Sequence, residues 1–307
     1  MRLPAFSAFG ASIAYVVTHF LTLLRISWLP ALLLMAVFVY VAPSMLDAQM
    51  NMAMAEGDAP GQAAMMAAMG ENLKATGFLY LASAIFYPML IAGVLRHVVR
   101  GEAPRLPFYL WFGGDEFRVL ISYILLIVMA ILLSVVGMLA IMVVGIVSAM
   151  VSQAVGGIIM LVLSLAFGVA VIWFMLRMSV VFPASVGERT IGIARSWSLT
   201  KGNAWNLFFY WLLWMIILMV ICVVYVMFAV GDFLSLIPEM IAAGADEAAM
   251  QEIEQKMLSI ESSLYDRSSP GFWPYIVSTY LYTVVSFAFS TAASGVAYRY
   301  LAGEQRG

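Results

Sequence analysis

Six long stretches of the chain are almost continuously apolar. A helix that crosses the hydrocarbon core of a bilayer needs about 20 predominantly apolar residues, and each stretch reaches that length. Strands of a lipid-facing barrel would instead alternate apolar and polar positions. The pattern therefore predicts an all-α membrane protein with six transmembrane helices, at 27–46, 76–98, 119–146, 157–181, 205–230 and 273–301.

Residues 119–157 carry no charge at all. The third and fourth spans are therefore expected to form a tight hairpin that turns near 148–156. The composition agrees with a membrane protein, since 64% of the residues are hydrophobic and 10% are charged; soluble domains have about 45 to 50% and about 25%. Because the first apolar run is long enough to span, we expect an uncleaved anchor rather than a signal peptide, although Ala42 and Ser44 resemble a cleavage site.

The basic residues predict the orientation in the membrane. If the N-terminus is cytoplasmic, the outer loops contain only Lys74, Lys256 and Arg267, and twelve Lys and Arg residues are inside. Lys and Arg are retained on the cytoplasmic side of bacterial spans. We therefore expect a multi-pass protein of the bacterial inner membrane with both termini in the cytoplasm. The single cysteine, Cys222, lies within the fifth span and predicts no disulfide or thiol site.

The stretch WFGGDEFR, at 111–118, contains the signature pentapeptide of diguanylate cyclases. Only about 20 residues separate the second and third spans, and no compact catalytic domain forms from so few. The match is therefore expected to be a coincidence. Its aromatic residues suit the membrane interface, and Gly113 and Gly114 permit a bend before Asp115, which we expect to cap the third span.

A common plan recurs three times along the chain: an interfacial elbow helix, a span, an outer turn and a second span that ends in basic residues. The elbows are expected at 5–24, 105–117 and 190–204. The sequence AGVLRHVVRGE from Ala92 also echoes SGVAYRYLAGE from Ser294. We expect one six-span domain, 1–307, built from three hairpins in parallel orientation at about 1–104, 105–189 and 190–307.

The segment 177–208 reads RMSVVFPASVGERTIGIARSWSLTKGNAWNLF. It places an Arg at a span end, then a Pro and a Glu, a short helix with Arg-Ser-Trp, and a Thr-Lys-Gly-Asn turn. In order, these positions are Arg177, Pro183, Glu188, Arg195, Ser196, Trp197, Thr200, Lys201, Gly202 and Asn203. This order resembles a bacterial integral membrane family related to the membrane domain of glycerophosphodiester phosphodiesterases. The soluble catalytic barrel of those enzymes needs about 250 further residues, so the resemblance implies a membrane module without phosphodiester hydrolysis.

The same segment contains the candidate binding residues. Arg177 lies so near the apolar run that it either snorkels to the interface or joins Arg189, Arg195 and Lys201 in a basic pocket for a lipid phosphate on the cytoplasmic face. The elbow is expected to start with Thr190 as a cap and to end at Gly202 in the left-handed conformation. Asn203 is expected to cap the fifth span, and Trp197 to lie at headgroup depth.

The sequence contains no HExxH motif, Walker loop or GxSxG motif. His19 and His97 are interpreted as interfacial side chains. We therefore expect a protein that is not an enzyme and has no cofactor. Met50, Met52 and Met54 leave copper binding as a weak alternative, because thioethers bind Cu(I) but the loop has no Cys or His.

The outer segment 231–272 is too long for a simple turn. Apolar residues recur there at spacings of three and four, at Met250, Ile253, Met257, Ile260 and Leu264, and predict one amphipathic helix. This helix is expected to cap the outer ends of the spans or to dock a partner. The function favoured by the whole sequence is binding of membrane lipids, or of another membrane or periplasmic protein, in envelope or lipid homeostasis, with no nucleic-acid partner. A lipid or small-solute transporter is the alternative.

Overall fold

The computed structural model describes residues 2–54, 59–103, 110, 112–244 and 246–303. Helices dominate this part of the chain, and it contains no strand. In chain order they are α1 (Ala5–Thr18), α2 (Phe20–Met54), α3 (Ala59–Arg100), α4 (Gly114–Val151), α5 (Gln153–Met178), α6 (Val181–Glu188), α7 (Ile193–Leu199), α8 (Ala204–Ala229), α9 (Gly231–Ser235), α10 (Ile237–Ala243), α11 (Glu247–Tyr265) and α12 (Phe272–Ala302).

Six of the described helices, α2, α3, α4, α5, α8 and α12, are long and apolar enough to cross a membrane. The prediction of an all-α, multi-pass membrane protein is confirmed at this level. The turn between α4 and α5 is at Ser152, inside the predicted interval. The fourth span was expected to end at residue 181; α5 ends at Met178 and α6 begins at Val181, and together they lie in one apolar stretch from Ala154 to Glu188 that is long enough to span.

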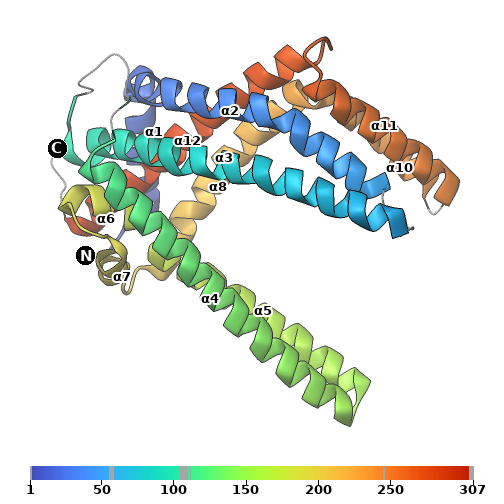
Figure 1. The fold of residues 1–307 in the computed structure, drawn as a ribbon. Coiled ribbons are helices and arrows are strands. Elements are labelled where there is room, and N and C mark those ends of the chain that lie inside the picture. The colour runs from blue at the N-terminus through green and yellow to red at the C-terminus, as the bar shows by residue number, and fades with distance from the viewer. Residues whose placement is uncertain (1, 55–58, 104–109, 111, 245, 304–307) are drawn as a thin grey trace.

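The helices α2, α3, α8 and α12 pack together, and the α4/α5 hairpin extends away from them (Figure 1). Helix α12 is central, since it contacts α1, α2, α3, α6, α8 and α11. Two buried aromatic residues connect it and α1 to α8. Tyr210 donates its hydroxyl to the Ala293 carbonyl at 2.8 Å, and Trp214 Nε1 donates to Ser12 Oγ at 2.9 Å. These two buried donors are thus satisfied inside an apolar setting.

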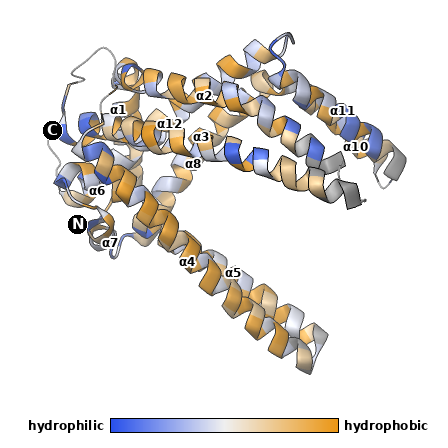
Figure 2. Cartoon of the chain, in the orientation of Figure 1, coloured by the Kyte–Doolittle hydropathy of each residue, from blue (hydrophilic) through white to orange (hydrophobic). Residues whose placement is uncertain are grey.

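The α4/α5 hairpin is apolar along nearly its whole length (Figure 2). None of the residues in the most apolar stretch of either helix is buried in the protein. The two helices approach each other closely at Gly137, where an added Cβ would lie 2.1 Å from the Phe167 ring. Such an exposed apolar hairpin has the surface expected of a lipid-facing element.

Helices α1, α6 and α7 gather with both chain ends at one end of the molecule, and α10 and α11 lie toward the other (Figure 1). The echoing sequences meet at the first of these ends. Both α3 and α12 end before a glycine in the left-handed conformation, Gly101 at φ 67° and Gly303 at φ 78°. An added Cβ on Gly295 would lie 2.7 Å from Val98 Cγ1, so the two echoing segments pack directly on each other.

Helix α11 confirms the amphipathic helix predicted within 231–272. It packs against α2, α9, α10 and α12. Ile253 and Leu264 are buried, with 4% and 8% of their surface exposed, whereas Met250 and Met257 remain 38% and 37% exposed. Two of the five residues of the predicted apolar stripe are therefore buried in the chain's own fold, as in a cap.

Candidate functional site

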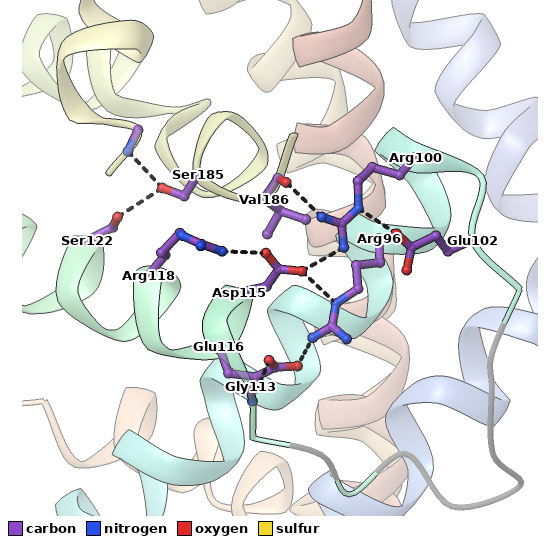
Figure 3. Close-up of polar contacts among 11 residues, drawn as sticks. Arg96, Arg100, Glu102, Gly113, Asp115, Glu116, Arg118, Ser122, Ser185 and Val186 are labelled. Carbon is purple, nitrogen blue, oxygen red and sulfur yellow. Dashed lines mark hydrogen bonds and ion pairs between the residues drawn. The ribbon is translucent and has the colours of Figure 1, made fainter. Parts of the chain in front are cut away.

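The pentapeptide near Gly113 is part of an ionic network between α3 and α4 (Figure 3). Arg96 and Arg100 lie one turn apart at the end of α3, and Asp115 lies in the first turn of α4. The Asp115 carboxylate accepts from Arg100 Nη2 at 2.6 Å and from Arg118 Nη1 at 2.9 Å, and it forms an ion pair with Arg96, whose Nε lies 3.2 Å away. We call these residues, with Glu102 and Glu116, the α3–α4 clasp.

Glu116 is the most deeply buried member of the clasp, since its side chain is fully shielded from solvent. It forms an ion pair with Arg96, and its Oε2 accepts the backbone N–H of Gly113 at 2.9 Å. A carboxylate in the first turn of a helix is also favoured by the helix dipole. A buried acid is tolerated only when it is paired in this way.

The clasp contains three arginines and three carboxylates, because Arg100 Nε also pairs with Glu102 at 2.9 Å. Its formal charges therefore balance and leave no net charge to attract a ligand. Arg100 further donates to the Val186 carbonyl at 3.3 Å, which connects the clasp to α6. These acids therefore connect α3 to α4.

Two details of this segment differ from the sequence interpretation. Asp115 was expected to be the helix cap, but α4 begins at Gly114 with Gly113 as its N-cap. The Asp115 carboxylate pairs with arginines of the clasp instead. Most of the predicted elbow at 105–117 lies outside the described residues. No local spacing in the sequence could have predicted the clasp, because Arg96 and Asp115 are nineteen residues apart.

A second polar contact joins α4, α6 and the turn before α7 (Figure 3). Ser122 Oγ and Ser185 Oγ lie 2.9 Å apart, and Ser185 Oγ accepts the backbone N–H of Gly192 at 2.9 Å. The backbone approaches so closely here that a Cβ on Gly192 would lie 2.2 Å from the Val181 carbonyl oxygen. Gly192 is thus required by packing, and it, not Thr190, is the N-cap of α7.

Arg177, the first residue of the predicted lipid-phosphate site, lies at the end of α5 against the indole rings of Trp173 and Trp197, whose centroids are 5.2 Å apart. Its guanidinium carbon lies 4.4 Å from the Trp197 ring centroid and 5.6 Å from that of Trp173. Only 6% of the residue is exposed, and its Nε has no hydrogen-bond partner among the described residues. The site therefore presents a buried cation with donor capacity that cation–π contacts do not use.

The other three predicted basic residues are exposed. Arg195 Nε pairs with Glu188 Oε1 at 2.5 Å, so a carboxylate already offsets its charge. Arg189 ends α6 in the left-handed conformation at φ 55°, and Lys201 follows α7. The structure brings Arg177 against the α7 helix, and it leaves Arg189 and Lys201 on the surface of the same segment.

The elbow residues were predicted with mixed success. Gly202 is left-handed at φ 77°, and Asn203 is the N-cap of α8, as predicted. The Asn203 side chain does not cap the helix, however, because its Oδ1 accepts the backbone N–H of Leu3 at 2.8 Å. The hydroxyl of Thr200 and that of Ser196 donate to the Arg177 carbonyl, at 3.2 and 2.8 Å. The elbow is thus fixed to α5 and to the N-terminal segment.

The described residues contain no group of three or more His, Cys, Asp or Glu side chains that could hold a metal ion. The side chains of Met50, Met52 and Met54 lie outside the described part of the structure, so the copper alternative stays a prediction.

Comparison of the chain with protein-family models, with curated proteins and with solved structures returned no match. The proposals below therefore depend on the residues of this chain and on their geometry.

Proposed function

We propose that this chain is a non-enzymatic, multi-pass protein of the bacterial inner membrane that binds an anionic phospholipid at its cytoplasmic end. Arg177 is the observation that carries the proposal. It is a permanent cation at the end of α5, it is buried against two tryptophans, and its Nε lacks a partner among the described residues. Tryptophan is enriched at the depth of the lipid headgroups, where the phosphates of the lipids are the available anions.

Nearby charges support the same proposal. Arg189 and Lys201 are exposed on the segment that holds Arg177, and no ion pair involves either of them among the described residues. A phosphate beside Arg177 would therefore meet further positive charge.

The orientation is part of the proposal. The distribution of basic residues predicts that the end formed by α1, α6 and α7 faces the cytoplasm and that α11 faces the periplasm. Single cysteines at Glu188 and Glu252, introduced into a Cys222→Ala background, test it with a membrane-impermeant maleimide in intact cells. We expect labelling at Glu252 and protection at Glu188. The reverse pattern would refute the orientation.

Two finer features belong to the same proposal. The three-hairpin repeat is supported by the matching glycine ends of α3 and α12 and by their direct packing at Gly295. The resemblance of residues 177–208 to the phosphodiesterase membrane domains stays a hypothesis about ancestry, and it makes a lipid ligand chemically reasonable.

Lipid binding is tested by mass spectrometry of lipids that co-purify with the protein in a mild detergent. The Arg177→Gln variant is expected to lose bound phosphatidylglycerol or cardiolipin, because the buried cation is removed. Lys256→Gln is the matched control, since Lys256 lies on α11 at the opposite end. An anionic lipid complement equal in the wild type, the variant and the control would refute the proposal.

Arg177→Gln also removes a packed side chain, so the folding of the variant must be checked by its thermal unfolding. The double variant Arg189→Gln, Lys201→Gln avoids this difficulty because both residues are exposed. It is expected to weaken retention of the anionic lipid without changing the unfolding temperature.

A further inference from the structure

A groove of about 400 Å³ lies between α8 and α12, on the halves of these two helices that lead to α9 and α11. Most of its lining is aliphatic and includes Val224 of α8 and Val277, Leu281 and Val285 of α12. Among the described residues, no charged side chain lines it. A ligand that fits this groove is therefore apolar along most of its length.

The side chains of the two helices explain why the groove opens at this level. In the other half of the pair, Tyr210 donates to the Ala293 carbonyl at 2.8 Å, and the small, fully buried Ala288 lets the helices pack closely. In the groove half, Tyr225 of α8 stacks on Tyr282 of α12 with a centroid separation of 4.5 Å. Both of these rings line the groove, which opens beside them.

The groove has the depth of one leaflet of the membrane. Along α12 its lining extends from Pro274 to Val285, which is a rise of about 16 Å at about 1.5 Å per residue. Half of the hydrocarbon core of a bilayer is about 15 Å thick. Trp273, next to the first lining residue of α12, is 63% exposed, as suits an indole in the headgroup region. The groove thus extends from the headgroups to about the middle of the bilayer.

The hydroxyl groups of the groove already have partners within the protein. Ser278 Oγ donates at 2.6 Å to the backbone carbonyl four residues earlier, and the Tyr225 hydroxyl lies 3.2 Å from Thr279 Oγ1. The Tyr282 hydroxyl has the Cys222 side chain as its hydrogen-bonding neighbour. A polar headgroup would therefore gain little inside the groove, whereas an aliphatic chain fits its lining.

We propose that this groove binds one acyl chain of a phospholipid from the leaflet at the α11 end of the protein. The chain lies along α12 from Pro274 toward Val285, with its headgroup beside Trp273. Lipid tails already surround the spans, so packing contacts rather than the hydrophobic effect hold the chain in place. The groove shares no residue with the site at Arg177, and the proposal does not depend on lipid binding there.

The test uses the wild-type protein in nanodiscs that contain phosphatidylcholine with a photoreactive diazirine on one acyl chain. Mass spectrometry of peptides locates the adducts after irradiation. We expect about tenfold more adduct at Val277 and Leu281 than at Val135 and Leu139 of α4, because the groove contacts a chain on several sides. The pairs are matched in exposure, at 52% and 54% against 49% and 51%. Equal labelling of the two pairs means annular lipid only and overturns the proposal.

The position of the diazirine tests the direction of the bound chain. A diazirine near the carboxyl end of the chain is expected to label α12 near Val277. A diazirine near the terminal methyl group is expected to label it near Val285. The reverse order would overturn the proposal, because the chain would then enter from the opposite leaflet.

Two neighbouring residues of α8 offer a matched pair of variants. Val223 and Val224 are 50% and 49% exposed, and only Val224 lines the groove. Val224→Trp fills the groove and is expected to reduce the adduct at Leu281 by about tenfold. Val223→Trp is expected to leave the adduct unchanged, and both variants should unfold at the wild-type temperature. Labelling that is the same in Val224→Trp as in the wild type would refute the assignment.

A helix of a second copy of the chain is the competing occupant of the groove. Leu281→Cys in a Cys222→Ala background reports it through oxidative cross-linking, and we expect only monomers on a denaturing gel. A cross-linked dimer with Leu281→Cys but not with Leu139→Cys would assign the groove to a protein interface and overturn the proposal. Arg177→Gln is expected to leave the labelling of the groove unchanged, so the two lipid proposals fail or hold separately.

Discussion

Replacing Glu116 with Gln tests whether the α3–α4 clasp holds the hairpin to the rest of the protein. Glu116 is fully buried, and its carboxylate neutralises Arg96 while it accepts the Gly113 N–H. Gln preserves the shape and keeps an acceptor for Gly113, but it removes the negative charge. Breaking one partner of a buried ion pair costs about 3 to 5 kcal/mol. Asp115 still forms an ion pair with Arg96 at 3.2 Å, so we expect the lower end of that range, about 3 kcal/mol.

The assay is unfolding of the detergent-solubilised protein by sodium dodecyl sulfate, which gives a free energy of unfolding when the transition is reversible. Hydrogen exchange at the first turn of α4 shows whether the loss is local, and we expect faster exchange there. Glu252→Gln is the control, because the Glu252–Lys256 pair is solvent-exposed and such pairs contribute little. If Glu116→Gln unfolded like the wild type and like this control, the clasp would not be a structural joint.

Two further predictions concern packing. Ile253→Asp is expected to lower the free energy of unfolding by about 3 kcal/mol or more, because it puts a charge in a buried position. Met250→Asp, on the exposed side of α11, is the control and is expected to have little effect. Equal effects of the two variants in thermal unfolding would refute the role of α11 as a cap. Gly192→Ala is expected to cost more than about 2 kcal/mol, because its Cβ would lie 2.2 Å from the Val181 carbonyl oxygen. Gly10→Ala is the control, since nothing lies within 4 Å of that Cβ, and a Gly192→Ala protein as stable as this control would contradict the close approach.

Local patterns in the sequence were sufficient to predict most helices. The six spans follow from the length of apolar runs, because backbone polar groups in a bilayer must be bonded within the segment. The turn at Ser152 and the helix α11 follow from a break in an apolar run and from spacings of three and four residues. The caps were less predictable, because Asp115 and Thr190 have capping side chains but the caps are Gly113 and Gly192.

Only the tertiary structure decided which charged side chains meet. Arg96 and Asp115 are nineteen residues apart and separated by a segment outside the described residues, so no helical spacing relates them. The position of Arg177 against both Trp173 and Trp197 required α7 to fold back onto α5. The meeting of His19 with His97 required α1 and α3 to end at the same place. The length of an apolar run is a property of consecutive residues and is visible in the sequence. Ion pairs and pockets depend on contacts between segments that are distant in the sequence.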